Sequence, residues 1–591
     1  MRTSLDSTAG TVEFSEGPCW IAAGKGNLAR NRGSCLALHG FLAFNGEGPR
    51  TLQEALEKKS RQPDWDLRFS GHYVLTFADP TRNKLELYRD PTGDEQLYYA
   101  RIKDVLLFAS SLKPLLAHNQ VPHKLNFEAV TQRCLSELVV FGNATLWEGI
   151  QEVLPGHRLV VNKNGIRHEW HWGGLLQSPE SDSAALTRRL KDSLLDAIKS
   201  AIGADRQAAV SLSGGIDSSA IAVLAVELLG PENVSAFTYE FEDPAHPSEV
   251  PYAARVCRHL GITRHHIIKI SHRQYMDRIA EAIGKAEDPA YWRRPYVLEF
   301  SRRINEKGFN KYLTGFGLGS HLGYLEDLTE ILPWIPFPDK ILRYWRPRPS
   351  PQPDNFLLEL NRLPLWALAH PGLRPPFHRL LYPLLCVLKH HGIIRDLRHF
   401  YPAGLYELAE NTLKSGRFLE AILELKDEPL EMQLKRLSFS HLNSSVDITR
   451  HARLSRQAGA VGVSPAFFPS CIPLTHLPCR AKSRPWGHRR SMRPGKFLLQ
   501  EAMRGRLPDE IIMRRKYWPH PGGSPQWRGA AIGLMESASP QSLALLKSHF
   551  GPAFENLRRY FPQNIIPLAF WHHLIYDSAQ TPAEANDYHA G

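Results

Sequence analysis

A chain of 591 residues is too long for one hydrophobic core, so its length predicts at least two domains. Hydrophobic residues make up 43% of the chain and charged residues 22%, as is ordinary for a globular protein. The formal charge of +12 indicates an anionic partner, such as a phosphorylated small molecule or an acidic peptide. Nucleic acid is disfavoured as a partner, because no helix-turn-helix, zinc-finger or aromatic RNA-binding signature occurs.

Membrane and metal signals are missing from the sequence. The first residues lack an apolar signal core, and no apolar run approaches the ~20 residues needed to span a bilayer, so we expect a cytoplasmic protein without a membrane partner. Seven cysteines show neither a paired metal-ligand spacing nor a short disulfide framework, which predicts reduced thiols. None of the 27 histidines stands in a His-Glu-x-x-His pattern, so no zinc site is predicted.

Short strand signals bounded by glycine and proline fill roughly the first 170 residues. They include apolar runs, one alternating segment and a closing hairpin. Together they predict a β-rich sandwich domain over residues 1–172. The segments concerned are 34–40, 71–78, 84–88, 96–99, 105–109, 154–161 and 165–170.

From about residue 185 the pattern changes to alternating helices and strands, which predicts an α/β domain with a parallel sheet over residues 185–591. Leucines and isoleucine at helical spacing over 186–198 precede an apolar strand at 208–212, and a helix follows at 219–229. Further strands are expected at 234–239 and 309–314. Proline and tryptophan are dense from 333 to 383, which we interpret as an inserted loop, with a surface linker as the alternative. Helices are expected to predominate after it.

The strongest motif is Ser-Gly-Gly-Ile-Asp-Ser at residues 213–218, between a predicted strand and a predicted helix. Its glycines let the backbone approach an anion, and amides at the helix start and serine hydroxyls supply donors. It lacks the Gly-Lys-Ser/Thr ending of the nucleoside-triphosphatase loop and the third glycine of the dinucleotide fingerprint. Asp217 within it suits Mg²⁺ on a departing pyrophosphate. A Gly-Gly turn capped by serine and aspartate is the alternative.

This motif resembles the pyrophosphatase-type loop, or PP-loop, of enzymes that split ATP into AMP and pyrophosphate. Two later segments, Gly-Lys-Phe-Leu-Leu-Gln at 495–500 and Arg-Arg-Lys at 514–516, narrow the resemblance to the asparagine synthetase family. The resemblance implies an adenine nucleotide α hydrolase-like fold with helical additions for the second domain. It also implies ATP and Mg²⁺ as cofactors and a ligase that forms a carbon–nitrogen bond.

The same resemblance implies roles for individual residues. Asp217 would hold the metal. Lys516 would stabilise charge on the phosphoryl and acyl transition states, and Lys496 would support the ATP phosphates or Lys516. An exposed helix-end lysine is the alternative for Lys516. The residues expected to bind the nucleotide and its pyrophosphate are Leu212, Ser213, Gly214, Gly215, Asp217, Ser218 and Gly315.

The N-terminal strand series resembles the glutamine amidotransferase domain of this family, in which an Arg-Asp-x-x-Gly turn, here at 89–93, precedes a Leu-Tyr-Tyr strand. In the family a cysteine directly after the initiator methionine attacks glutamine, and this chain has Arg2 there. The glutamine-binding Asn-Gly-Glu segment also looks replaced, by residues 38–41, with 45–47 as a rival alignment. We therefore expect no ammonia from this domain, which would persist as a scaffold or docking surface.

A second departure falls after the strand at 309–314. There the family has Gly-Glu-Gly-Ser-Asp-Glu or Gly-Tyr-Gly-Ser-Asp, whose later acid contacts a second Mg²⁺. Here Phe316 replaces the residue that helps to activate the nucleophile, and Gly319 replaces the acid. Glu326, Asp327 and Asp288 are the candidate substitute ligands.

Loss of an activating residue is tolerable if the nucleophile is an amine that is already neutral. A peptide α-amine has a pKa of roughly 8, so about a tenth of it is neutral at pH 7. A chain of this family without the amidotransferase cysteine resembles lasso peptide macrolactam synthetases. That resemblance implies a precursor peptide as substrate, a leader peptidase as a possible partner, and an isopeptide ring as product. The alternatives are a β-lactam synthetase-like or ammonia-dependent ligase, and a non-catalytic binding homologue, which Phe316 and Gly319 favour.

Overall fold

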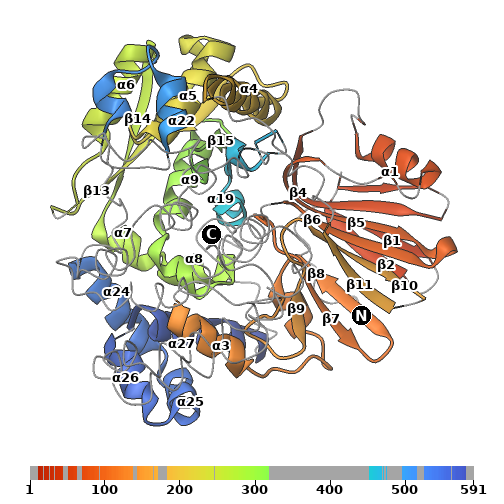
Figure 1. Cartoon of the computed structure of the whole chain (residues 1–591). Coiled ribbons are helices and arrows are strands. Elements are labelled where there is room, and N and C mark those ends of the chain that lie inside the picture. Colours follow the sequence, from red (N-terminus) through yellow and green to blue (C-terminus); the bar gives the residue numbers. More distant parts are fainter. Residues whose placement is uncertain are drawn as a thin grey trace, which may run out of the picture.

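The computed structural model describes residues 11–580 with gaps, of which the longest are 171–182, 319–450, 475–495 and 515–524. A β-rich part formed by the N-terminal segment lies beside an α/β part, and the last helices gather at the base of the molecule (Figure 1). Within the described ranges, no helix is long and apolar enough to cross a membrane.

The N-terminal part is built on a six-stranded antiparallel sheet of order β11-β10-β6-β5-β4-β3. A separate hairpin joins β1 and β2. The closing hairpin predicted from the sequence is confirmed as β10–β11. The strand bounds are β1 (Thr11–Glu16), β2 (Cys19–Gly24), β3 (Leu28–Arg30), β4 (Cys35–Ala43), β5 (Ser70–Asp79), β6 (Lys84–Arg89), β10 (His157–Asn162) and β11 (Gly165–Trp170).

A second sheet of order β8-β7-β9 packs on the first, so the predicted sandwich is confirmed. Strand alternation explains this packing, because side chains from one face of each strand meet in a shared apolar layer. That layer contains Val74, Leu87, Leu97, Tyr99, Val153 and Leu159. The new strands are β7 (Tyr98–Ile102), β8 (Val105–Ala109) and β9 (Ile150–Glu152).

The second part contains a five-stranded sheet of order β14-β13-β12-β15-β16, in which every pair is parallel. Both faces are buried, as all-parallel sheets require. Leu212 and Val210 face a core shared with α4 (Ser183–Ile202), α5 (Ile216–Leu229) and α22 (Phe497–Met503). Ala209 and Phe237 face a core shared with α8 (Ile279–Ala286), α24 (Pro525–Ala538) and α27 (Pro562–Gln580). The strands are β12 (Ala208–Ser211), β13 (Val234–Phe241), β14 (Arg264–Ile270), β15 (Lys311–Leu313) and β16 (Val461–Val463).

The helices follow from apolar spacing and local capping. The predicted leucine spacing produces α4. Most residues of α5 from Ile216 to Ala225 are buried. Gly261, in the left-handed region with φ 74°, caps the end of α6. The bounds are α1 (Leu52–Arg61), α2 (Leu112–Leu116), α3 (Phe127–Ser136), α4 (Ser183–Ile202), α5 (Ile216–Leu229), α6 (Val250–Leu260), α7 (His272–Asp277), α8 (Ile279–Ala286), α9 (Tyr296–Glu306), α19 (His451–Gln457), α22 (Phe497–Met503), α23 (Asp509–Ile512), α24 (Pro525–Ala538), α25 (Pro540–Phe550), α26 (Ala553–Tyr560) and α27 (Pro562–Gln580).

Buried polar contacts join the two parts. Glu287 of the second part caps the start of α2 by accepting from Ser111 Oγ at 2.5 Å and from the amide of Leu112 at 2.7 Å. Arg453 Nη2 lies 3.1 Å from Oε2 of the same carboxylate. Apolar residues of both parts also share one continuous core. The domain boundaries at 172 and 185 stay predictions.

Most expected strands and helices are found close to their predicted positions. Helices predominate among the described residues after the insertion, as expected, but β16 was not predicted, because it is too short to carry a periodic signal although it completes the parallel sheet. The predicted insertion at 333–383 lies outside the described residues. Three buried cysteines among the described residues, Cys134, Cys257 and Cys471, take part in no disulfide, and the reduced state of the thiols stays a prediction.

Candidate active site

The candidate site lies at the carboxyl end of β12, where the order of the parallel sheet reverses. β12 pairs with β13 on one side and with β15 on the other, so their following loops diverge at the position where open parallel sheets bind ligands. The PP-loop fills the turn between β12 and α5. Leu212 is fixed there, because its amide donates to Phe237 O at 2.8 Å and its carbonyl accepts from Thr238 Oγ1 at 2.7 Å.

Serine side chains brace the PP-loop. The Ser213 amide donates to Ser218 Oγ at 3.1 Å, the two hydroxyl oxygens are 3.1 Å apart, and Ser218 Oγ donates to Gly215 O at 3.2 Å. Gly214 has φ +66°, and a Cβ there would lie 2.5 Å from the Tyr252 carbonyl carbon. No side chain caps α5 at Gly215, so its first amides are available to an anion. Direct contact of the serines with pyrophosphate stays a prediction.

Gly315 packs against the start of α5. A Cβ at this position would lie 2.5 Å from the Ser218 amide nitrogen and 2.6 Å from the Asp217 carbonyl carbon. The loop after β15 can therefore approach the PP-loop only because residue 315 has no side chain. The structure thus brings Gly315 together with the other predicted binding residues.

We expect Gly315→Ala to reduce ATP binding, because the added methyl group must displace backbone atoms at the start of α5. Gly284→Ala in α8 is the matched control, because its Cβ would meet no atom within 4 Å. Calorimetric titration with ATP and Mg²⁺ checks this. Equal affinities for the two variants would show that the close approach does not matter.

Asp217 in the first turn of α5 and Lys496 at the start of α22 form an ion pair, in which Lys496 Nζ donates to Asp217 Oδ2. The carboxylate is 18% exposed, and its Oδ1 is a buried oxygen without a hydrogen-bond partner among the described residues. A partly buried carboxylate oxygen beside uncapped amides fits Mg²⁺ with its phosphate ligands, since Mg²⁺ is held by one or two carboxylates plus substrate oxygens. Asp217 would hold that ion and Lys496 the phosphates.

Arg514 belongs to the site but was given no role in the sequence analysis. Its Nη1 donates to Ser213 O at 2.8 Å, its Nη2 lies 3.3 Å from Glu249 Oε1, and its guanidinium lies 3.7 Å from the centre of the Tyr252 ring. It therefore ties the PP-loop to the start of α6. Its position in the Arg-Arg-Lys signature was the sequence signal that could have identified it as a site residue. Lys516 lies outside the described residues.

Asp288 cannot replace the missing acid, which corrects one expectation from the sequence. It is 7% exposed, pairs with Arg133 of α3 and caps a 3₁₀ helix (Pro289–Arg293) by accepting from the Ala290 amide at 2.8 Å. Its proximity in sequence was misleading, because its carboxylate joins the two parts of the chain. Gly319, Glu326 and Asp327 lie outside the described residues. The described ranges contain no cluster of three or more potential metal ligands.

Phe316 is held between a cation and an imidazole. The Arg294 guanidinium lies 4.8 Å from the centre of its ring, and the His451 ring lies 5.4 Å away at 32°. Burial, and then the charge of Arg294, lowers the pKa of His451 to about 3. His451 is therefore neutral at pH 7, with its Nε2 3.1 Å from the Tyr312 hydroxyl.

We expect acid to destabilise the protein through His451. Its folded-state pKa of about 3 lies below the ordinary 6.5, so the stability it contributes is complete above pH 6.5 and is lost as the pH falls toward 3. Between pH 7 and pH 5 the loss should be about 2 kcal/mol. Urea unfolding of the wild type and of His451→Gln checks this, since the variant should lack that part of the pH dependence. Identical pH dependence would contradict the assignment.

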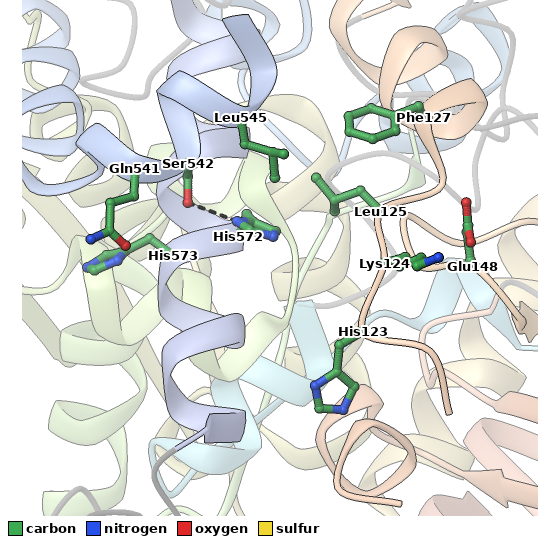
Figure 2. A pocket seen from close by; sticks show the side chains of 10 residues that line it. All are labelled: His123, Lys124, Leu125, Phe127, Glu148, Gln541, Ser542, Leu545, His572 and His573. Carbon is green, nitrogen blue, oxygen red and sulfur yellow. Dashed lines mark hydrogen bonds between the residues drawn. The ribbon is translucent and has the colours of Figure 1, made fainter. Parts of the chain in front are cut away.

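A separate cavity of about 400 Å³ is lined by residues of α25 and α27, helices that lie at the base of the molecule away from α5 (Figure 1), and Figure 2 shows its lining side chains. Figure 2 shows His572 on α27, whose Nδ1 lies 2.8 Å from Ser542 Oγ of α25. None of the predicted site residues lines this cavity. Its lining residues are His123, Lys124, Leu125, Phe127, Glu148, Gln541, Ser542, Leu545, His572 and His573.

Comparison with known families matches both parts of the chain. The asparagine synthase family model matches residues 189–320, and the glutamine amidotransferase domain model matches residues 57–172. The predicted fold is thereby confirmed: an amidotransferase-like β-rich sandwich precedes a parallel-sheet synthetase domain.

Curated relatives agree with these domains. Amidase chyE of Penicillium rubens is 26% identical over 277 residues, which are 43% of this chain and 40% of that protein. Glutamine-hydrolyzing asparagine synthetase 1 of Bacillus subtilis is 28% identical over 319 residues, 50% of this chain and 49% of that protein. The chain thus spans about half or less of these relatives. The two domain models and the curated relatives thus agree that this chain is similar to proteins of the asparagine synthetase family.

Proposed function

We propose that this chain is an ATP- and Mg²⁺-dependent macrocyclase. It adenylates an Asp or Glu side-chain carboxylate of a precursor peptide and joins it to the N-terminal amine of the same peptide. The observation that carries the proposal is the serine-braced PP-loop, in which Asp217 is paired with Lys496. This arrangement supports pyrophosphate release, and hence adenylation of a carboxylate, as the first half-reaction.

Adenylation proceeds by attack of a carboxylate oxygen on the α-phosphorus of ATP, with pyrophosphate as the leaving group. The uncapped amides at the start of α5 and Lys496 would stabilise charge on that leaving group. Bound Mg²⁺ supplies further charge neutralisation, with Asp217 as its protein ligand. In the second half-reaction the amine attacks the acyl carbon, AMP leaves and the amine loses its proton to solvent.

Support for a peptide amine as the nucleophile comes from the residues around Phe316. Neither the phenyl ring of Phe316 nor neutral His451, which is a weak base because its pKa is lowered to about 3, readily accepts a proton from an ammonium ion. A peptide α-amine has less need of a base, and its attachment to the acyl group provides proximity. The amidotransferase match also begins at residue 57, downstream of the position where that family carries its thiol.

Peptide-dependent exchange of labelled pyrophosphate into ATP tests this function. A candidate precursor peptide should stimulate exchange with Mg²⁺ present, and replacing one particular Asp or Glu of the peptide by Asn or Gln should abolish it. Exchange that persists after every acidic residue of the peptide is replaced would contradict side-chain activation. Stimulation by free aspartate with ammonia as acceptor would instead favour an ammonia-dependent ligase.

A further inference from the structure

Polar contacts run from the core of the N-terminal sandwich to the loop beside the PP-loop. His72 of β5 is fully buried, and its Nδ1 lies 2.8 Å from Asp94 Oδ2. Its Nε2 accepts from the amide of Ser464 at 3.3 Å. Ser464 Oγ in turn donates to the carbonyl of Phe316, the residue directly after Gly315. A side chain of the amidotransferase-like domain is thus two hydrogen bonds away from the candidate site.

The Asp94 end of this series is rigidly held. The buried Asp90 carboxylate accepts from the amides of Gly93 at 2.7 Å and Asp94 at 3.2 Å. Arg89, which is fully buried, donates to Gly93 O at 2.8 Å and to Glu95 O at 2.6 Å. The turn therefore fixes the Asp94 backbone from both sides, and Asp94 orients the His72 ring.

The Ser464 end of the series is connected to the PP-loop. Ser464 directly follows β16, and the amide of Thr314 donates to Val463 O at 2.9 Å, so the ends of β15 and β16 are joined. Gly315, next along the chain, packs against Asp217 and Ser218 with no room for a Cβ. Any displacement of the loop at 315–318 must therefore also shift the backbone at Asp217, the proposed Mg²⁺ ligand.

We propose that His72 is a positioning residue for the synthetase reaction: through Ser464 it holds the loop at 315–318 against the PP-loop. The amidotransferase-like domain would then be a structural part of the ligase site, which gives it a role without glutamine hydrolysis. This inference rests on the proposed function for its catalytic consequence. The positioning itself can be measured without substrate.

Hydrogen–deuterium exchange of the full-length protein tests the positioning. In His72→Leu we expect amides of peptides spanning 313–318 and 461–468 to exchange about fivefold faster or more, because the hydrogen bond to Ser464 is lost. His72→Gln keeps an acceptor and should restore most of the protection. His168→Leu is the control: His168 is bonded to Tyr99 at 2.7 Å in the same domain, away from this series.

If His72→Leu does not fold, Ser464→Ala tests the other link, because it removes the donor to Phe316 and leaves the sandwich intact. Unchanged exchange at 313–318 in the folded variants would overturn the inference. Pyrophosphate exchange is measured alongside, where His72→Leu should lower kcat more than it raises the KM for ATP and His72→Gln should recover activity. Wild-type protein without pyrophosphate exchange would contradict the proposed function, whereas deuterium exchange still decides the role of His72.

Discussion

Asp217→Asn should lower peptide-dependent pyrophosphate exchange by at least about a hundredfold. The substitution keeps the size of the side chain and removes the charge that suits Mg²⁺ on the departing pyrophosphate. It also ends the ion pair with Lys496. Initial rates of labelled ATP formation at several Mg²⁺ concentrations provide the measurement, and excess Mg²⁺ should not restore the wild-type rate.

Asp205→Asn is the matched control for Asp217→Asn. Asp205 is a half-exposed aspartate of the same domain that pairs with Lys311 at 2.9 Å. It lies outside the PP-loop, so its variant should exchange pyrophosphate at the wild-type rate. Normal exchange by Asp217→Asn would contradict the metal assignment and favour a Gly-Gly turn that is merely capped by serine and aspartate.

Lys516→Ala should lose ring formation by about a hundred- to thousandfold while ATP binding changes far less. A lysine directed at charge that develops in the transition state acts mainly on kcat, and removal of such a donor costs roughly 3 to 4 kcal/mol. Single-turnover formation of the cyclic peptide gives the rate, and calorimetric titration gives the affinity for ATP.

Lys547→Ala provides the comparison for Lys516→Ala, because Lys547 is an exposed lysine of α25 paired with Glu555 at 3.0 Å. Both variants remove one positive charge, yet ring formation should be unaffected by the change at Lys547. Equal rates for the two variants would mean that Lys516 belongs to a helix-end charge cluster without a catalytic role.

Much of the fold could be predicted from local patterns. Period-two alternation located β6, in which apolar and polar side chains alternate although the last four residues are all buried. Leucine spacing located α4, because those leucines face the core. β16 could not be found, because three residues carry no periodicity and its pairing with β15 is set by residues more than a hundred positions away. The buried polar contacts between the two parts escaped prediction for the same reason.

The site was predictable where one segment carries several functional groups. The PP-loop combines glycines, serines and Asp217 within six residues, and its position after a buried strand follows from the same segment. Asp288 was predicted as a metal ligand because it lies near the motif in sequence. In the structure a buried arginine of the other domain pairs with it instead. The contributions of Arg514 and His72 depend on contacts between distant segments, which a single sequence does not reveal.

The measurement that tests the central claim most directly is tandem mass spectrometry of the peptide product formed with ATP and Mg²⁺. We predict a product one water lighter than its precursor, with AMP and pyrophosphate released in equal amounts. Its N-terminal amine should be joined to an Asp or Glu side chain and so resist Edman degradation. A lighter product with a free N-terminus, or a product carrying an added ammonia nitrogen, would contradict macrolactam formation.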